Sequence, residues 1–172
     1  MFAGWDTYYQ MTGEAAATLT GLLFIVATLS AGRPTSGLSQ GMRLFTTPTV
    51  FHLVSVMVVS ALAIAPRAAG AAPCAIMAIW TGGSLIYVAL TAVGLARVKN
   101  PTHWSDVWCY GAAPLVIYLA LAVASAAAWD GMRYAADLLA LGLLSLLALT
   151  IRNAWDLVTW LAPRRDGGQP EG

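Results

Sequence analysis

Five stretches of this chain are long and apolar enough to cross a lipid bilayer, whose hydrocarbon core of about 30 Å takes roughly 20 residues of helix. Backbone groups in lipid must find their hydrogen bonds within the segment, so each stretch predicts an α-helix. The predicted spans cover residues 12–32, 48–65, 73–96, 108–129 and 134–161. Only 10% of the 172 residues are charged, against roughly 25% in a soluble domain. The sequence therefore predicts an all-α integral membrane protein with five transmembrane helices.

The segments between these spans are too short to form a soluble domain. We expect a single transmembrane helical domain over residues 1–162, followed by a flexible polar tail over residues 163–172 that is rich in Gly and Pro. Pro48 and Pro66 bound the second span, because a residue without an N–H suits a helix start and a helix stop. The fifth span is about 28 residues, or roughly 42 Å, and is expected to tilt or to project beyond the bilayer.

Basic residues predict the orientation of the chain. Two arginines, Arg67 and Arg133, fall on the side of the N-terminus, and six basic residues fall on the other side: Arg33, Arg43, Arg97, Lys99, Arg164 and Arg165. Since basic residues concentrate in cytoplasmic loops, the N-terminus is predicted outside and the C-terminus in the cytoplasm. The predicted location is the cell membrane, as a multi-pass protein, and a bacterial inner membrane fits the strong preference for Arg over Lys.

The first span carries the most suggestive pattern. Polar and small residues recur along it at spacings of three and four, namely Glu14, Thr18, Gly21, Ile25, Thr28 and Gly32, so they share one face of a helix. One interpretation is a helix-packing seam, because small residues let helices approach closely in lipid. The other is the lining of a permeation pathway. Glu14 favours the second, since a carboxylate inside a span is costly unless it is hydrated, paired or protonated, although it could also be held at the water boundary.

Four further residues are candidates for a vestibule or an interface. His52 lies near the start of the second span and is either buried or able to titrate in a vestibule. Asp137 lies near the outer end of the fifth span, and Arg152 and Asp156 lie four residues apart toward its inner end, where they are able to pair. The pair either anchors the helix at the level of the lipid headgroups or belongs to an inner vestibule or subunit contact.

A second polar stripe follows the third span through Trp80, Ser84, Tyr87, Thr91 and Gly94. We expect it to face the protein interior, where packing accounts for it.

The function that these patterns favour is a small oligomeric channel, cation-favouring, with the first helix lining the pathway. The predicted outer side holds four acids, Asp6, Glu14, Asp130 and Asp137, against two arginines, a net charge of −2 that would concentrate cations. Five helices seldom enclose a pathway alone, so a homo-oligomer is expected. The alternative is a non-catalytic accessory or interaction protein whose small-residue stripes pack against a partner. With no P-loop, H-E-x-x-H or C-x-x-C pattern, we expect no enzyme activity, cofactor, metal or nucleic acid; the expected partners are lipid, further copies and permeant ions.

Overall fold

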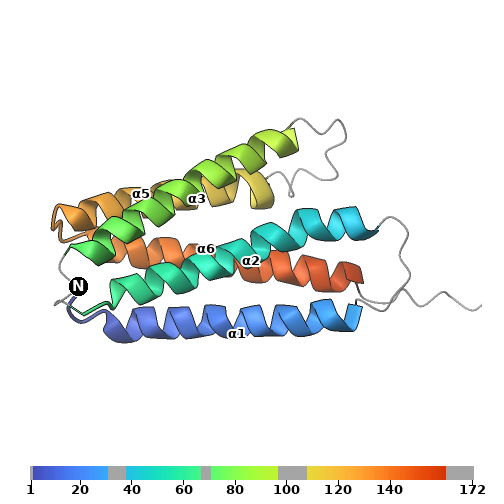
Figure 1. The fold of residues 1–172 in the computed structure, drawn as a ribbon, viewed down its shortest axis with the longest axis horizontal. Helices are drawn as coiled ribbons and strands as arrows, with labels where there is room; N and C mark the ends of the chain where they lie inside the picture. The colour runs from blue at the N-terminus through green and yellow to red at the C-terminus, as the bar shows by residue number, and fades with distance from the viewer. Residues whose placement is uncertain (1, 31–37, 67–70, 97–107, 162–172) are drawn as a thin grey trace, which may run out of the picture.

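The computed structural model describes residues 2–30, 38–66, 71–96 and 108–161 and contains helices and turns over these ranges. The helices, in chain order, are α1 (Asp6–Ser30), α2 (Leu38–Ala63), α3 (Ala72–Ala96), the π-helical turn η2 (Trp108–Ala112), α5 (Ala113–Trp129) and α6 (Ala135–Leu161). They lie side by side along one long axis, with α1 at one edge of the bundle and α3 and α5 at the other (Figure 1).

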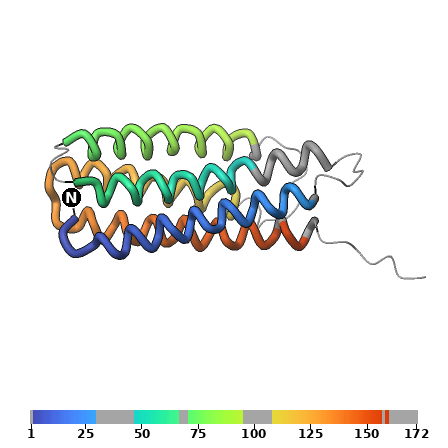
Figure 2. Tube along the Cα trace, turned by 60° about the horizontal axis from the view of Figure 1, so that its bottom comes forward, coloured from blue at the N-terminus to red at the C-terminus, as the bar shows by residue number. Residues whose placement is uncertain are grey.

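Successive helices run in opposite directions. The start of α1, the end of α2, the start of α3 and the turn between α5 and α6 all lie at the same end of the bundle (Figure 2). This grouping is the one that the predicted order of spans requires. Helix α1 begins at Asp6, six residues before the predicted start of its span, and Asp6 in the first turn interacts favourably with the helix dipole.

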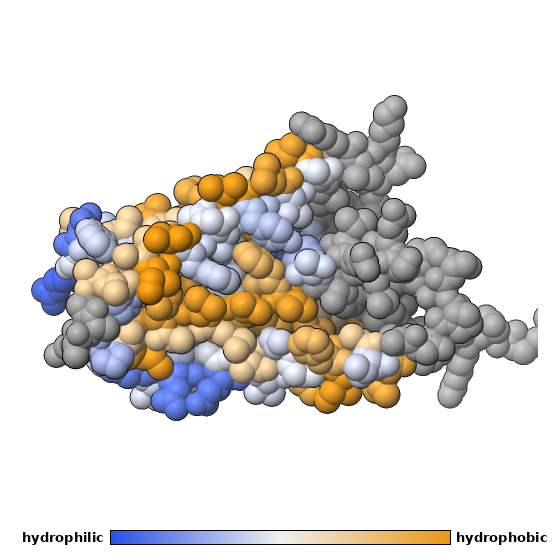
Figure 3. All heavy atoms as spheres, viewed as in Figure 1, coloured by the Kyte–Doolittle hydropathy of each residue, from blue (hydrophilic) through white to orange (hydrophobic). Residues whose placement is uncertain are grey.

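Four of the helices are long and apolar enough to cross a membrane: residues 6–29, 72–94, 108–129 and 135–156. Residues 47–63 of α2 form a shorter apolar helix. The predictions of an all-helical chain and of membrane-spanning helices are confirmed to that extent. In Figure 3 strongly apolar atoms are spread over the visible face among atoms of intermediate hydropathy, and the most hydrophilic atoms gather at one end and over part of α1.

Helix α2 differs from the prediction at Pro48. The helix starts ten residues earlier and continues through Pro48, so this residue lies inside the helix and does not start it. A proline is tolerated inside a membrane helix because neighbouring helices can satisfy the backbone groups that it leaves free. At the other end, α2 stops at Ala63, shortly before Pro66, as predicted.

The core is built around α2. Between Pro48 and Ala63 only Ala61 is exposed, and α1, α3 and α6 all pack against this helix. Large side chains from every helix fill the space around it: Tyr9, Leu53, Val56, Val59, Met77, Val88, Tyr118, Leu121, Leu139, Leu143 and Leu146 are at most 2% exposed. The interior of the described bundle is thus packed with side chains.

Pro114 leaves a carbonyl of the π-helical turn η2 without a backbone N–H partner. In a π-helix the carbonyl of Cys109 would accept from the N–H of residue 114, and proline has none. Asn153 of α6, which is 1% exposed, donates its Nδ2 to that carbonyl at 3.5 Å. The Tyr110 hydroxyl donates to the backbone carbonyl of Asn153, also at 3.5 Å. These two bonds fasten the start of the predicted fourth span to α6.

Candidate functional site: the outward face of α1

The predicted stripe on α1 points away from the rest of the chain. Glu14, Thr18, Gly21, Ile25 and Thr28 are all exposed, and Ile25 is 55% exposed. The opposite side of the same helix contributes Tyr9, Thr12, Ala16 and Leu23 to the core. No helix of the described chain therefore seals the stripe. The sixth member, Gly32, lies outside the described residues.

Two tyrosines fix the level of Glu14 within the bundle. The Tyr8 and Tyr9 hydroxyls donate to the backbone carbonyls of Ala140 and Ala136 in α6, each at 2.8 Å. At this same end Trp129 and Tyr134 are 57% and 54% exposed, the kind of aromatic belt that marks a membrane surface. Glu14 follows Tyr9 by five residues, or about 7–8 Å along the helix. Glu14 thus lies closer to the middle of the bundle than the aromatic belt does.

The polar groups of the stripe differ in how far the chain satisfies them. The Thr18 hydroxyl donates to the backbone carbonyl of Glu14 at 2.9 Å, and the Thr28 hydroxyl to that of Ile25 at 2.9 Å. Glu14 accepts one bond, from Gln10 Nε2 at 2.9 Å, on the exposed surface. A carboxylate has about four acceptor sites. Among the described stripe residues, Glu14 is therefore the group with the greatest unmet demand for water, cations or donors.

The two glycines of α1 have different surroundings. A Cβ added at Gly13 would lie 3.2 Å from the Cβ of Ser60, so this glycine permits the close approach of α1 and α2. A Cβ added at Gly21 would meet nothing within 4 Å. Gly21 is thus not needed for packing inside the described chain, and its small size is available only to something outside it.

His52 is buried, with 3% of its surface exposed. Its Nδ1 lies 3.1 Å from the Tyr118 hydroxyl of α5, and Phe51 and Tyr118 surround the ring at centroid distances of 6.1 and 5.5 Å. About two turns further along α5, Ser125 accepts from Thr81 of α3 at 3.2 Å. These side chains form polar links between α2, α3 and α5 inside the bundle, and none of them lies on the outward face of α1.

The second predicted stripe is partly interior. Ser84 is 3% exposed, and the half-buried rings of Trp80 and Tyr87 lie against Phe51 of α2, with centroids 6.2 and 4.5 Å away. Gly94, at the end of the stripe, is exposed. The stripe therefore faces the protein interior in the middle of α3, as expected, but not at Gly94.

The charged residues of α6 occupy its two ends. Asp137 is exposed in the first turn, where a carboxylate favours the helix dipole. Arg152 Nη1 and Asp156 Oδ2 are 3.2 Å apart, with side chains 42% and 44% exposed, so the predicted pair forms. Arg152 also donates to Asn153 Oδ1 at 3.4 Å, which couples it to the η2 contact. The structure brings this pair together but does not bring it to Glu14, which lies near the other end of the bundle.

The start of α2 overlaps a sequence pattern that is also found at hydrolase active sites. Residues 37–41 spell Gly-Leu-Ser-Gln-Gly, which fits the G-x-S-x-G pattern of a hydrolase nucleophile. That pattern works on a sharp turn between a strand and a helix. Ser39 lies instead in the first turn of α2, and the described residues contain no strand. Within those residues there is also no group of three or more His, Cys, Asp or Glu side chains able to hold a metal ion.

Comparison of the chain with protein-family models, with curated proteins and with solved structures gave no match.

Proposed function

We propose that this protein spans the cell membrane five times and assembles around α1 into a small cation-favouring channel. Five spans are supported by the position of α2. This helix is enclosed by α1, α3 and α6, two of which are themselves flanked by exposed apolar side chains such as Leu22, Ile79 and Leu90. A helix packed among spanning helices shares their depth, so α2 is counted as the fifth span although its apolar segment is short.

The proposed orientation has the N-terminus outside and the C-terminus in the cytoplasm. Arg133 lies in the described turn between α5 and α6, at the same end as the start of α1. The other loop arginines and Lys99 lie in segments whose side chains are not described, and their assignment to the two sides follows from the order of the helices. In this orientation Glu14 lies toward the outer surface and Arg152 and Asp156 toward the cytoplasm.

The observation that carries the proposal is the position of Glu14 on the exposed face of α1, about two turns inside the helix. An acidic side chain facing hydrocarbon near the centre of a span costs on the order of 2.5–3.5 kcal/mol, and less toward the surface. Symmetry-related copies of α1 around a hydrated axis would remove that cost, because water and cations would complete the acceptor sites that Gln10 leaves open. The interior of one chain is filled, so the pathway is proposed between chains.

An accessory or interaction protein is the second candidate, and one observation favours it. The Thr18 and Thr28 hydroxyls already donate to their own helix, and Gly21 leaves open space, so this part of the face suits a dry seam against a partner helix. The two candidates differ in what surrounds Glu14. In a channel it borders water; in an accessory protein it pairs with a donor from the partner.

Substitution of the carboxylate tests the proposal. Glu14→Gln keeps the size of the side chain and removes its charge, and Asp130→Asn does the same at an exposed residue of the α5–α6 turn, which is not part of α1. Purified protein in planar bilayers should conduct, and Glu14→Gln should shift the reversal potential in a KCl gradient toward zero. The shift should be larger near 0.01 M salt than near 1 M, where charges act over only about 3 Å.

Asp130→Asn, as the control, should change selectivity less. If neither the wild-type protein nor the variant conducts although both form the same assembly, the channel proposal fails and the accessory function takes its place. Equal selectivity of the wild type and Glu14→Gln in a conducting protein would place the pathway away from α1.

A further inference from the structure

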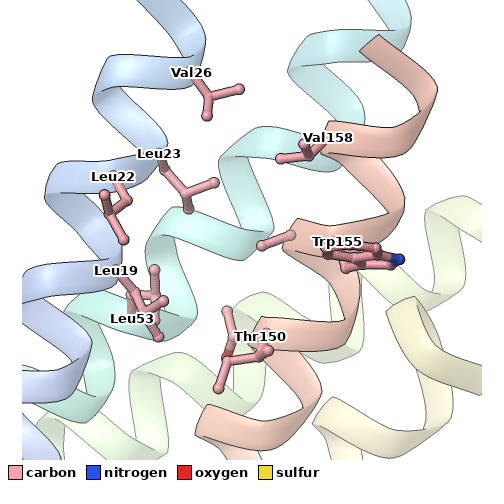
Figure 4. Close-up of a pocket in the computed structure, with 10 residues that line it drawn as sticks. Leu19, Leu22, Leu23, Val26, Leu53, Thr150, Trp155 and Val158 are labelled. Carbon is pink, nitrogen blue, oxygen red and sulfur yellow. The ribbon is translucent and has the colours of Figure 1, made fainter. Parts of the chain in front are cut away.

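A groove runs between α1 and α6 in the half of the bundle away from the N-terminus. Its volume is about 290 Å³. Leu19, Leu22, Leu23 and Val26 line it from α1, Leu53 forms part of its floor, and Thr150, Ile151, Ala154, Trp155 and Val158 line it from α6 (Figure 4). The groove is apolar and opens to the outside of the bundle, since Leu22, Ile151 and Trp155 are 52%, 49% and 67% exposed.

The groove and one large exposed side chain lie on opposite flanks of the Glu14 face. At 100° per residue, Leu22 lies about 80° to one side of Glu14, and Phe24 lies about 80° to the other. Leu22 is on the flank that borders α6, whereas Gly13 and Phe24 are on the flank that borders α2. Phe24 is 64% exposed and is the largest side chain on its flank of the described helix.

Phe24 and the groove are also at the same level. Helices α1 and α6 run in the same direction, and the bonds from Tyr8 and Tyr9 join residues 132 and 127 positions apart. The same offsets put Phe24 level with residues 151–156 of α6, which include Ile151, Ala154 and Trp155 of the groove. When copies are related by an axis along the membrane normal, each residue keeps its depth from copy to copy. A neighbouring Phe24 would therefore arrive at the depth of the groove.

We propose that the groove between α1 and α6 receives Phe24 of a second copy of this chain. This inference rests on the proposed assembly around α1. The contact is head-to-tail, because a copy gives Phe24 on one flank and receives a Phe24 on the other, and such a contact forms a ring where the rotation between copies closes. The Glu14 faces, which lie between the two flanks, then all point toward the axis. In lipid the contact is held by close packing, since lipid tails are as apolar as the groove.

Paired cysteines test the contact in the full-length protein in native membranes, with Cys74 and Cys109 replaced by Ala. Phe24→Cys combined with Ala154→Cys should form intermolecular disulfides on mild oxidation and give a ladder of dimers and larger species. Neither single variant should do so. The control is Phe24→Cys combined with Leu90→Cys, because Leu90 lies on α3 and is 69% exposed. This pair should stay monomeric on a denaturing gel. A dimer from Phe24→Cys alone, or no ladder from the pair, overturns the proposal; in the latter case the groove is left to lipid.

A size exchange gives a second measurement. Ala154→Phe fills the groove and should weaken association by about tenfold or more per contact, equivalent to about 1.4 kcal/mol. Phe24→Ala should weaken it similarly, and the double variant Phe24→Ala with Ala154→Phe should recover part of the loss, whereas Leu90→Ala should change nothing. Independent effects of the two substitutions overturn the proposal. A cross-linking ladder from a protein that never conducts would support this contact and refute the channel. Conduction without the ladder would support the channel and refute this contact.

Discussion

Gly142 of α6 is the position where one added carbon tests the packing most directly. A Cβ built there lies 2.6 Å from Leu121 Cδ2 and 3.1 Å from its Cγ. Carbon atoms attract best at about 3.5–4.0 Å, so in Gly142→Ala the new Cβ and Leu121 Cδ2 must move apart by roughly 1 Å. Leu121 of α5 is fully buried in the core, so any new rotamer must find its space among other core side chains. The strain must be relieved by an unfavourable rotamer or by moving α5 away from α6.

The magnitude follows from two opposing terms. Overpacking by a methyl group costs about 1–3 kcal/mol in a close-packed core. Alanine is a better helix former than glycine by about 0.8–1.0 kcal/mol in water. That gain is smaller here, because a membrane helix keeps much of its structure in the detergent-unfolded reference state. Gly142→Ala should therefore lower the free energy of unfolding by about 1–2 kcal/mol.

Unfolding in mixed micelles of mild detergent and dodecyl sulfate, followed by circular dichroism, measures this change. Gly82→Ala in α3 is the matched control, because its added Cβ meets nothing within 4 Å, and it should be neutral or slightly stabilising. Leu121→Ala makes room for the new methyl group, so the double variant should lose at least about 1 kcal/mol less than the sum of the single variants. A Gly142→Ala protein as stable as the wild type, or strictly additive effects, would refute the close approach of α5 and α6.

Three further predictions concern the outward face, the interior and the topology. Gly21→Leu should leave the stability of the single chain unchanged within about 0.5 kcal/mol and should disrupt assembly measured by light scattering. Gly13→Leu, beside Ser60, should cost about 1–3 kcal/mol of stability. Equal effects of the two substitutions on stability would contradict the assignment of the two faces. Tyr118→Phe should cost about 0.6–1.7 kcal/mol by removing the bond to His52, and Tyr134→Phe, which is exposed, should cost nothing in the same titration. In a cysteine-free background, Met132→Cys should react with an impermeant thiol reagent on intact cells and Gly168→Cys should not; the opposite labelling would reverse the proposed orientation.

The helices were predictable because apolar length is a sufficient signal in a chain of this kind. Three of the five predicted spans begin within one residue of the observed helices. The two larger differences have local causes. At Pro48 the helix runs through the residue that the sequence signal takes as its start, and at the N-terminus the hydrogen bonds of Tyr8 and Tyr9 tie the first turns of α1 to α6.

The candidate site was predictable as a pattern but not as a surface. Spacing places Glu14, Thr18 and Gly21 on one face, yet it does not say whether that face points inward or outward. The direction depends on contacts between distant residues, such as Gly13 with Ser60. The same limit applies to His52, because nothing near it in sequence indicates that Tyr118 of α5 would supply its partner. The groove and the level of Phe24 depend on the offset between α1 and α6, which only the folded chain defines.

The two polar groupings of this chain are satisfied in different ways, and this difference locates the expected activity. Inside the bundle His52 Nδ1 has the Tyr118 hydroxyl as a partner, and Thr81 donates to Ser125, so these two groups find partners on other helices of the chain. Glu14 has one partner, on its own helix, and faces outward. Evolution of a dry outer surface would have favoured an apolar residue there, since a carboxylate in lipid destabilises the inserted helix. The exposed face of α1 is therefore where we propose that water, cations or a partner's donor complete the hydrogen bonds of Glu14.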